Sequence, residues 1–343
     1  MEKINKIFKA LDENYIGKLF EEKRLIYFPE QNNKKITAIE IEKKSPGWQQ
    51  ETCLAKYKIF FGKDDQKIVW GASSKNESKK NAWKTMKHLF HNGFDRGQAR
   101  VARPLDFINE TSLLLYEEAK GIPLTTIIRG KDIKKAEESL KNAAKWISRL
   151  HGTQPETDSL SDAIFLEAGD YDRVFTDINN LMPDLKNELI LASELEFINQ
   201  ISKEQKTLIH NDFYPGNIIV DDAVIYGIDF EKSGLGFPLT DAATLLGWFE
   251  FPVESRALNF SRNDTQNLQN IFLEAFCDLS KLDYAETRQD LNKFLAKIFL
   301  DQVYICTLLA TDSWGYIGPA AKNGNREKIR ELLQKAKHYI SLI

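Results

Sequence analysis

The chain changes from short strand-like segments to long helical ones near residues 117–121, which read Glu-Glu-Ala-Lys-Gly. Before this point, apolar and polar residues alternate in short runs, and beyond it apolar residues recur at helical spacing. A chain of 343 residues is also too long for one ordinary hydrophobic core. The pattern therefore predicts an α+β, two-lobed fold, with an N-terminal lobe over residues 1–118 and a C-terminal lobe over residues 119–343.

The N-terminal lobe is expected to be a small antiparallel sheet with one main helix after an opening helical segment over 4–23. The helix spans 77–90 and has Asn76 as a plausible cap. Strands are expected over 36–42, 52–61, 67–72, 101–107 and 112–116. The C-terminal lobe is expected to be mainly helical. One helix runs from a cap at Asp132 to about Leu150, with Gly152 at a left-handed end, and later helices cover 263–279, 286–311 and 326–342.

Charge is unevenly distributed along the chain. The net charge of −3 gives no indication of binding to nucleic acid or to an anionic membrane. Residues 1–118 carry 22 basic and 17 acidic side chains, whereas residues 151–250 carry 5 and 19. This asymmetry suits a nucleotide in the first lobe and a cationic partner in the second, although a solvated surface explains it equally well.

The chain shows no sign of export or membrane insertion. No apolar run approaches about 18 residues, and charges interrupt the first 20 residues. The three cysteines are odd in number and far apart, which is typical of reduced thiols. A cytoplasmic location is therefore expected.

The residues that indicate chemistry lie between Leu208 and Leu245. His210-x-Asp212-x4-Asn217 is followed by two apolar runs around Asp221-Asp222-Ala223, which predicts a tight hairpin, and then by Asp229-Phe230-Glu231. The hairpin is expected to bring Asn217 beside Asp229, and their oxygens are ligands that Mg²⁺ accepts. Asp212 could then face a substrate hydroxyl, as phosphoryl transfer requires. Asp and Asn are also turn formers, so a purely structural loop is the alternative, which Asp229 disfavours.

This segment resembles the aminoglycoside phosphotransferase and choline kinase superfamily, whose fold is that of a protein kinase with a different substrate lobe. Its loops read like HGDxxxxN and DFE, as residues 210–217 and 229–231 do here. Further matches are Leu150-His151-Gly152, the run from Gly236 to Asp241, and LLLYEEAKG over 113–121.

The resemblance implies a role for each matching position. Asp212 would be the catalytic base, Asn217 and Asp229 would bind Mg²⁺, and His210 and Asp241 would support the catalytic loop. The backbone carbonyl of Glu117 and the backbone N–H of Ala119 would meet the adenine of ATP (or GTP). His151 is expected to be a helix-end histidine without a catalytic role.

Two departures from the family pattern concern the nucleotide phosphates. Alignment of the third strand places Ala72 where the family has a phosphate-pairing lysine, so Lys67, Lys75 or another cation would have to replace it. Glu77 is the only early candidate for that lysine's helix partner. The glycine loop is marked only by Ser45-Pro46-Gly47, which is weak evidence.

The acceptor is expected among the helices after Gly236, where carboxylates could attract ammonium groups and aromatic faces could hold a quaternary amine. Taken singly, each candidate is more typical of the core or the surface than of a binding site. The candidates are Trp248, Glu250, Glu254, Asp301, Tyr304, Asp312 and Trp314.

The sequence thus predicts an ATP- and Mg²⁺-dependent kinase of a small hydroxyl-bearing molecule such as an aminoglycoside, an amino alcohol or a sugar. The alternative is a nucleotide-binding pseudokinase or scaffold, which Ala72 motivates. A protein-substrate kinase is disfavoured, because DFE replaces DFG and no APE-like segment follows.

Overall fold

The computed structural model describes residues 6–44, 52–76, 78–154, 162–190, 192–203, 205–310 and 319–343. It divides into two compact units. Unit 1 contains Met1–Gly121 and Tyr226–Ser233, and unit 2 contains Ile122–Pro155, Ser161–Ile225 and Gly234–Ile343. The segment that carries Asp229 therefore belongs to unit 1, although it follows about one hundred residues of unit 2 in the sequence.

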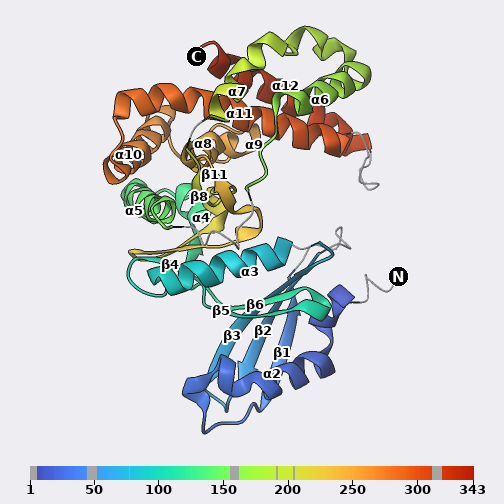
Figure 1. The fold of residues 1–343 in the computed structure, drawn as a ribbon, viewed down its shortest axis with the longest axis vertical. Coiled ribbons are helices and arrows are strands. Elements are labelled where there is room, and N and C mark those ends of the chain that lie inside the picture. Colours follow the sequence, from blue (N-terminus) through green and yellow to red (C-terminus); the bar gives the residue numbers. More distant parts are fainter. Residues whose placement is uncertain are drawn as a thin grey trace. The chain divides into compact units, whose positions relative to one another are not determined.

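Unit 1 is built on a five-stranded antiparallel sheet with the order β1-β2-β3-β6-β5 (Figure 1). The predicted meander and the last strand are confirmed. The strand expected over 101–107 is instead two strands, β4 (Ala99–Val101) and β5, which begins at Pro104. The strands of the sheet are β1 (Ala38–Lys43), β2 (Thr52–Phe60), β3 (Gln66–Ser74), β5 (Pro104–Ile108) and β6 (Leu113–Glu117).

The helix α2 (Glu13–Tyr27) packs on one face of this sheet and forms the core of unit 1 with it. Phe20 of α2 meets the ring of Tyr57 from β2 at 5.5 Å between centroids. A Cβ at Gly71 of β3 would lie 2.5 Å from that tyrosine ring, so only glycine fits beneath it. Because side chains alternate along a strand, Trp70 and Ala72 belong to the opposite face.

The helix α3 (Ser78–Leu89) follows β3 directly. Asn76 caps it as predicted, because its Oδ1 accepts the N–H of Ser78 at 3.1 Å. The helix also contacts the short turn η8 (Phe230–Lys232), which belongs to the same unit.

Unit 2 is mainly helical, and short strands lie among its helices (Figure 1). Strand β9 (Ile218–Asp221) begins the predicted hairpin, which turns at Asp222 with φ +51° and returns as β10 (Val224–Gly227). Strand β7 (Ile122–Pro123) pairs with β9, and β8 (Thr207–Ile209) pairs with β11 (Gly234–Gly236). The helices are α4 (Leu124–Ile128), α5 (Ile133–His151), α6 (Ala168–Leu181), α7 (Glu196–Ile201), α8 (Pro238–Trp248), α9 (Pro252–Arg256), α10 (Arg262–Ser280), α11 (Tyr284–Ala310) and α12 (Pro319–Ile340).

The predicted helices of this unit are confirmed with one correction at the end of α5. Asp132 caps α5 by accepting the N–H of Lys135 at 3.0 Å. Gly152 is not left-handed, since its φ is −81°. The helix instead closes with a tightened turn, in which the Gly152 N–H donates to the carbonyl oxygen of Ser148. Helices α6 and α8 were not predicted from the sequence.

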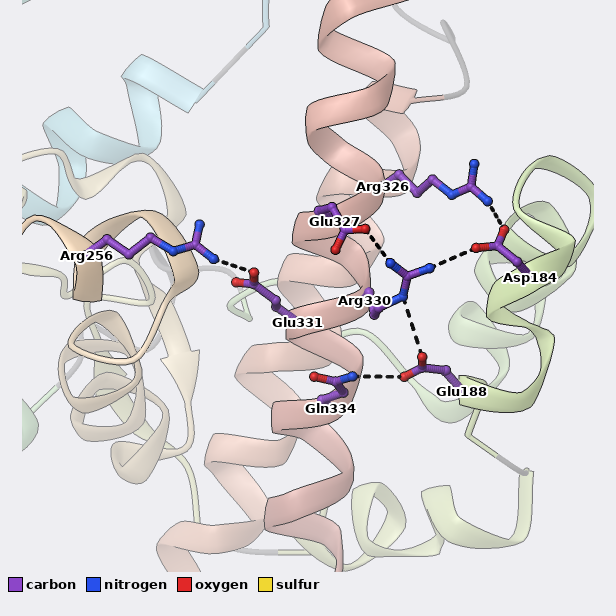
Figure 2. A network of polar contacts seen from close by, with 8 residues as sticks. All are labelled: Asp184, Glu188, Arg256, Arg326, Glu327, Arg330, Glu331 and Gln334. Carbon is purple, nitrogen blue, oxygen red and sulfur yellow. Dashed lines mark hydrogen bonds and ion pairs between the residues drawn. The ribbon is translucent and has the colours of Figure 1, made fainter.

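A polar network fixes the helix α12 within unit 2 (Figure 2). Arg330 contacts Asp184 at 2.8 Å and Glu188 at 3.6 Å, both from the turn η5 (Pro183–Glu188), and Arg326 reaches Asp184 as well. On the other side of α12, Glu331 pairs with Arg256 of α9. The acidic residues of 151–250 thus include some that neutralise a basic helix.

Of the helices within the described ranges, none combines the length and the apolar character that a membrane crossing requires.

The cap at Asp132 gives a test of the fold. Asp132→Ala removes the acceptor for the Lys135 N–H and should lower the free energy of unfolding by about 1 kcal/mol. Urea denaturation followed by circular dichroism measures this, with Asp132→Ser as the control that keeps a capping oxygen. Equal stability of the two variants would show that the cap contributes nothing.

Candidate active site

The buried carboxylate of Asp241 holds the backbone of the catalytic loop in unit 2. Its Oδ2 accepts the N–H of His210 at 2.9 Å and its Oδ1 accepts the N–H of Asn211 at 2.8 Å. The same Oδ2 lies 2.9 Å from Nε2 of His151 at the end of α5. Asp241 is 0 % exposed, so these three contacts replace the water that its charge would otherwise require.

Aromatic rings support the same loop from below. Trp146 of α5 stacks on Phe213 at 5.6 Å with an interplanar angle of 10°, and it meets the ring of His210 edge-on at 6.1 Å. His210 is fully buried in this cluster. Its position fits a support for the loop, as the family resemblance implied, and offers no exposed proton donor.

Asp212 and Asn217 lie in direct contact across the loop. The Nδ2 of Asn217 donates to Oδ2 of Asp212 at 3.1 Å and to the backbone oxygen of Asp212 at 3.0 Å. The loop can close this tightly because Gly216 lies under the ring of Tyr214, where a Cβ would approach to 2.4 Å. One amide therefore orients the carboxylate and leaves its own oxygen for another partner.

The segment of Asp229 has a constrained backbone in unit 1. Asp229 has φ +64° and ψ +62°, a left-handed conformation that Asp and Asn tolerate better than most residues. The next residue, Phe230, is completely buried, whereas Asp229 itself is exposed. The backbone therefore presents this carboxylate outwards from an anchored turn.

The two expected Mg²⁺ ligands belong to different units, Asn217 to unit 2 and Asp229 to unit 1, so their pairing stays a prediction. Their chemistry fits a hard cation. The Asn217 nitrogen is engaged by Asp212, which leaves the amide oxygen as its ligand, and Asp229 supplies an exposed carboxylate.

Helix α3 is tied to the segment after Asp229 by its first turns. Lys79 forms an ion pair with Glu231, and Ser78 donates its hydroxyl to the other Glu231 oxygen at 2.5 Å. Asn81 donates to the backbone oxygen of Ser233 at 2.8 Å. Burial lowers the pKa of the Lys79 ammonium, while the nearby charge of Asp229 acts in the opposite direction.

The residues expected at the nucleotide phosphates differ in their placement. Ala72 is buried in β3, and Lys67 of the same strand pairs with Glu30 at 2.7 Å. Lys75 is exposed just beyond β3 and forms an interaction of its own. Ser45-Pro46-Gly47 and Glu77 lie outside the described residues.

The connection between the predicted lobes begins at Glu117. The Glu117 N–H donates to the backbone oxygen of Arg103 at 2.9 Å, and the Glu118 N–H donates to the backbone oxygen of Ile68 in β3 at 3.2 Å. The use of the Glu117 carbonyl and the Ala119 N–H by a nucleotide base stays a prediction.

Three of the carboxylates expected at the acceptor lie in the described part of the chain, and each of these three has a partner within unit 2. Glu250 bonds to Lys335 at 2.6 Å, Asp301 bonds to Lys297 at 3.0 Å, and Glu254 pairs with Arg129. Trp248 is buried, with the Arg129 guanidinium 5.8 Å from its ring. A cationic acceptor at any of these positions would have to displace an internal cation. Tyr304 is half-buried on α11, and Asp312 and Trp314 lie outside the described residues.

Sequence reasoning missed Lys79 and Trp146. Trp146 has helical spacing with other core residues, so nothing in the sequence separates it from ordinary packing. Lys79 stands among several lysines, and only its low exposure, 13 % of the side chain, distinguishes it. His151 contacts Asp241, which agrees with the helix-end role expected of it.

Comparison with known proteins identifies this arrangement. A sequence model of the phosphotransferase enzyme family (APH) matches residues 74–286, which include Asp212, Asn217 and Asp229. Curated proteins gave no match to the chain.

Several solved structures share the fold. A choline kinase from Cryptosporidium parvum Iowa II has a TM-score of 0.59 at 14% identity, over 95% of this chain and 96% of that one. A Plasmodium vivax ethanolamine kinase has a TM-score of 0.57 at 13% identity, over 93% and 88%. An amicoumacin kinase in complex with AMP-PNP and Ca²⁺ has a TM-score of 0.57 at 14% identity, over 95% and 96%.

The fold is therefore kinase-like, with an antiparallel-sheet unit and a mainly helical unit, as predicted. The chain belongs to the phosphotransferase enzyme family, and the predicted class of small-molecule kinase is confirmed.

The role of Asp241 can be tested directly. Asp241→Ala leaves two buried N–H groups without an acceptor, at a cost of about 1–3 kcal/mol each, so both the midpoint of thermal unfolding and the turnover should fall. Asp221→Ala in the exposed hairpin turn is the control. If the two variants unfold at the same temperature, Asp241 does not support the loop.

Proposed function

We propose that the protein transfers the terminal phosphoryl group of ATP to a hydroxyl of a small molecule in a Mg²⁺-dependent reaction. The observation that carries this proposal is the Asp212–Asn217 contact, which orients a carboxylate on a loop that Asp241 braces. Two of the structural neighbours support the nucleotide, because their structures contain AMP-PNP, one of them together with Ca²⁺.

In the proposed reaction, Asp212 accepts a hydrogen bond from the acceptor hydroxyl and aligns its oxygen with the terminal phosphorus. A bond forms between that oxygen and phosphorus as the bond to the leaving oxygen of ADP breaks, and the hydroxyl proton passes to Asp212. Asn217 fixes the direction of the carboxylate throughout. Mg²⁺ held by Asn217 and Asp229 would supply charge neutralisation on the phosphate oxygens.

The acceptor is proposed to be a small hydroxyl-bearing molecule, among which aminoglycosides, amino alcohols and sugars are the first to test. The neighbours include aminoglycoside, choline and ethanolamine kinases, and these names describe those proteins alone. A screen of pooled compounds from these classes, read as ADP release with Mg²⁺, would name the class.

The role of Asp212 predicts the effect of its removal. Asp212→Ala should lower turnover by about 10²–10⁴-fold, the usual contribution of a general base, while ATP affinity changes little. Steady-state kinetics and calorimetric ATP binding measure the two effects. Asp221→Ala at the exposed end of β9 is the control, and near-normal turnover of Asp212→Ala would refute the assignment.

The role of Asp229 predicts a change in metal dependence. Asp229→Asn keeps a residue that tolerates the left-handed backbone but removes the charge, so a higher Mg²⁺ concentration should be needed for half-maximal ATP binding. Titration of Mg²⁺ at fixed ATP measures this shift. An unchanged Mg²⁺ requirement would remove Asp229 from the metal site.

A further inference from the structure

A kinase-like nucleotide site needs a cation at the phosphates, and the strand that normally provides it lacks one here. By the alignment with the family pattern Ala72 stands at that position, and its register partners are Leu54 on β2 and Leu114 on β6. Ala72 is only 4 % exposed, and its methyl group carries no charge, so this position supplies no cation to the nucleotide phosphates. Another element must supply the charge if ATP is to bind well.

The nearby strand lysines are unsuited to the task. Lys67 alternates with Ile68 and therefore lies on the face of Val69 and Gly71, where it pairs with Glu30 behind the sheet. Lys56 of β2 lies on the same face as Ala72. It is bonded to Glu118 in the connection at 2.7 Å and its ammonium lies 5.5 Å from the Trp70 ring, at the end away from α3.

Lys79 of α3 provides the positive charge that the Ala72 position of β3 lacks. Its ammonium is largely buried and forms an ion pair with Glu231, two residues after Asp229. Helix α3 also packs against the turn η8, which begins directly after Asp229, so Lys79 lies beside the segment that carries the proposed metal ligand.

Helix α3, which carries Lys79, also contacts the strands β3 and β6 of the sheet. Burial, together with the charge of Asp229, raises the pKa of Tyr116, which is the register partner of Trp70 on β6. Trp70 and Ala72 share one face of β3. Lys79, Asp229 and the face that carries Ala72 therefore border one region, and all of them belong to unit 1.

We propose that Lys79 binds the phosphates of the nucleotide in place of the absent strand lysine, with Glu231 as its counter-ion. In the family pattern the lysine lies on the third strand and its acidic partner lies on the helix. Here the lysine would come from the helix, and the acidic partner from the segment after Asp229. Ser78 shares Glu231, so the glutamate keeps a donor when the ammonium turns to a phosphate. This inference rests on the proposed function.

The test compares binding of ATP with Mg²⁺ and binding of adenosine, which lacks phosphates. Lys79→Met should weaken ATP binding on the order of 10–100-fold, the effect of one charged hydrogen bond, and leave adenosine binding unchanged. Lys79→Arg should retain most of the ATP affinity. Lys87→Met is the matched control, because Lys87 is exposed on the same helix, with its ammonium 5.0 Å from the Trp83 ring.

A second variant guards against misfolding. Lys79→Met leaves Glu231 without its cation, so the double variant Lys79→Met with Glu231→Gln removes both charges. It should show the same selective loss of ATP affinity, with a thermal midpoint close to that of the native protein.

The outcomes separate this inference from the proposed function. If the native protein binds no ATP with Mg²⁺, both are overturned. If it binds ATP, and Lys79→Met loses ATP and adenosine affinity equally or behaves as Lys87→Met does, the inference alone is overturned. A selective loss in Lys67→Met instead would return the role to the strand and also overturn it.

Discussion

The fully buried carboxylate of Asp241 determines the geometry of the catalytic loop. It accepts the N–H groups of His210 and Asn211 and contacts His151, so it joins the first turn of α8, the loop and the end of α5. A buried charge that does not contact water is stable only where fixed hydrogen-bond partners surround it. The charge in turn holds those partners in position. The direction of Asp212 depends on this arrangement, because the loop between Asn211 and Asn217 has no other buried anion beneath it among the described contacts.

Ion pairs between individual side chains connect other parts of the molecule. The acidic middle of the chain meets basic residues from later helices, as Asp184 and Glu188 do with Arg330 (Figure 2). Glu250 likewise bonds to Lys335. The charge imbalance that suggested a cationic acceptor is therefore explained in part by internal neutralisation. Exposed pairs of this kind contribute little to stability one by one, and their effect is to fix where the helices pack.

The sequence predicted the class of fold and several local features for physical reasons that the structure makes clear, whereas the catalytic role of the loop stays a prediction. Strand alternation, helix caps at Asn76 and Asp132, and the hairpin turn at Asp222 are local features, and local features can be seen in a sequence. The position of Lys79 depends on a contact with Glu231 more than 150 residues away, which no local pattern encodes. The prediction of a left-handed Gly152 at the end of α5 was wrong, because a tightened turn satisfies the last carbonyls as well as a left-handed one does.

Asn211 and Asp229 both have left-handed backbones, with φ of +58° and +64°. At each of these positions the conformation already favours glycine, asparagine and aspartate over most other residues, before any chemistry is considered. The proposed metal role would restrict Asp229 further, to a residue with a ligand oxygen. Under that proposal, a change of Asp229 to glycine would keep the backbone conformation and remove the metal ligand without unfolding the protein. A relative that has lost activity in this way would look intact by every measure of stability.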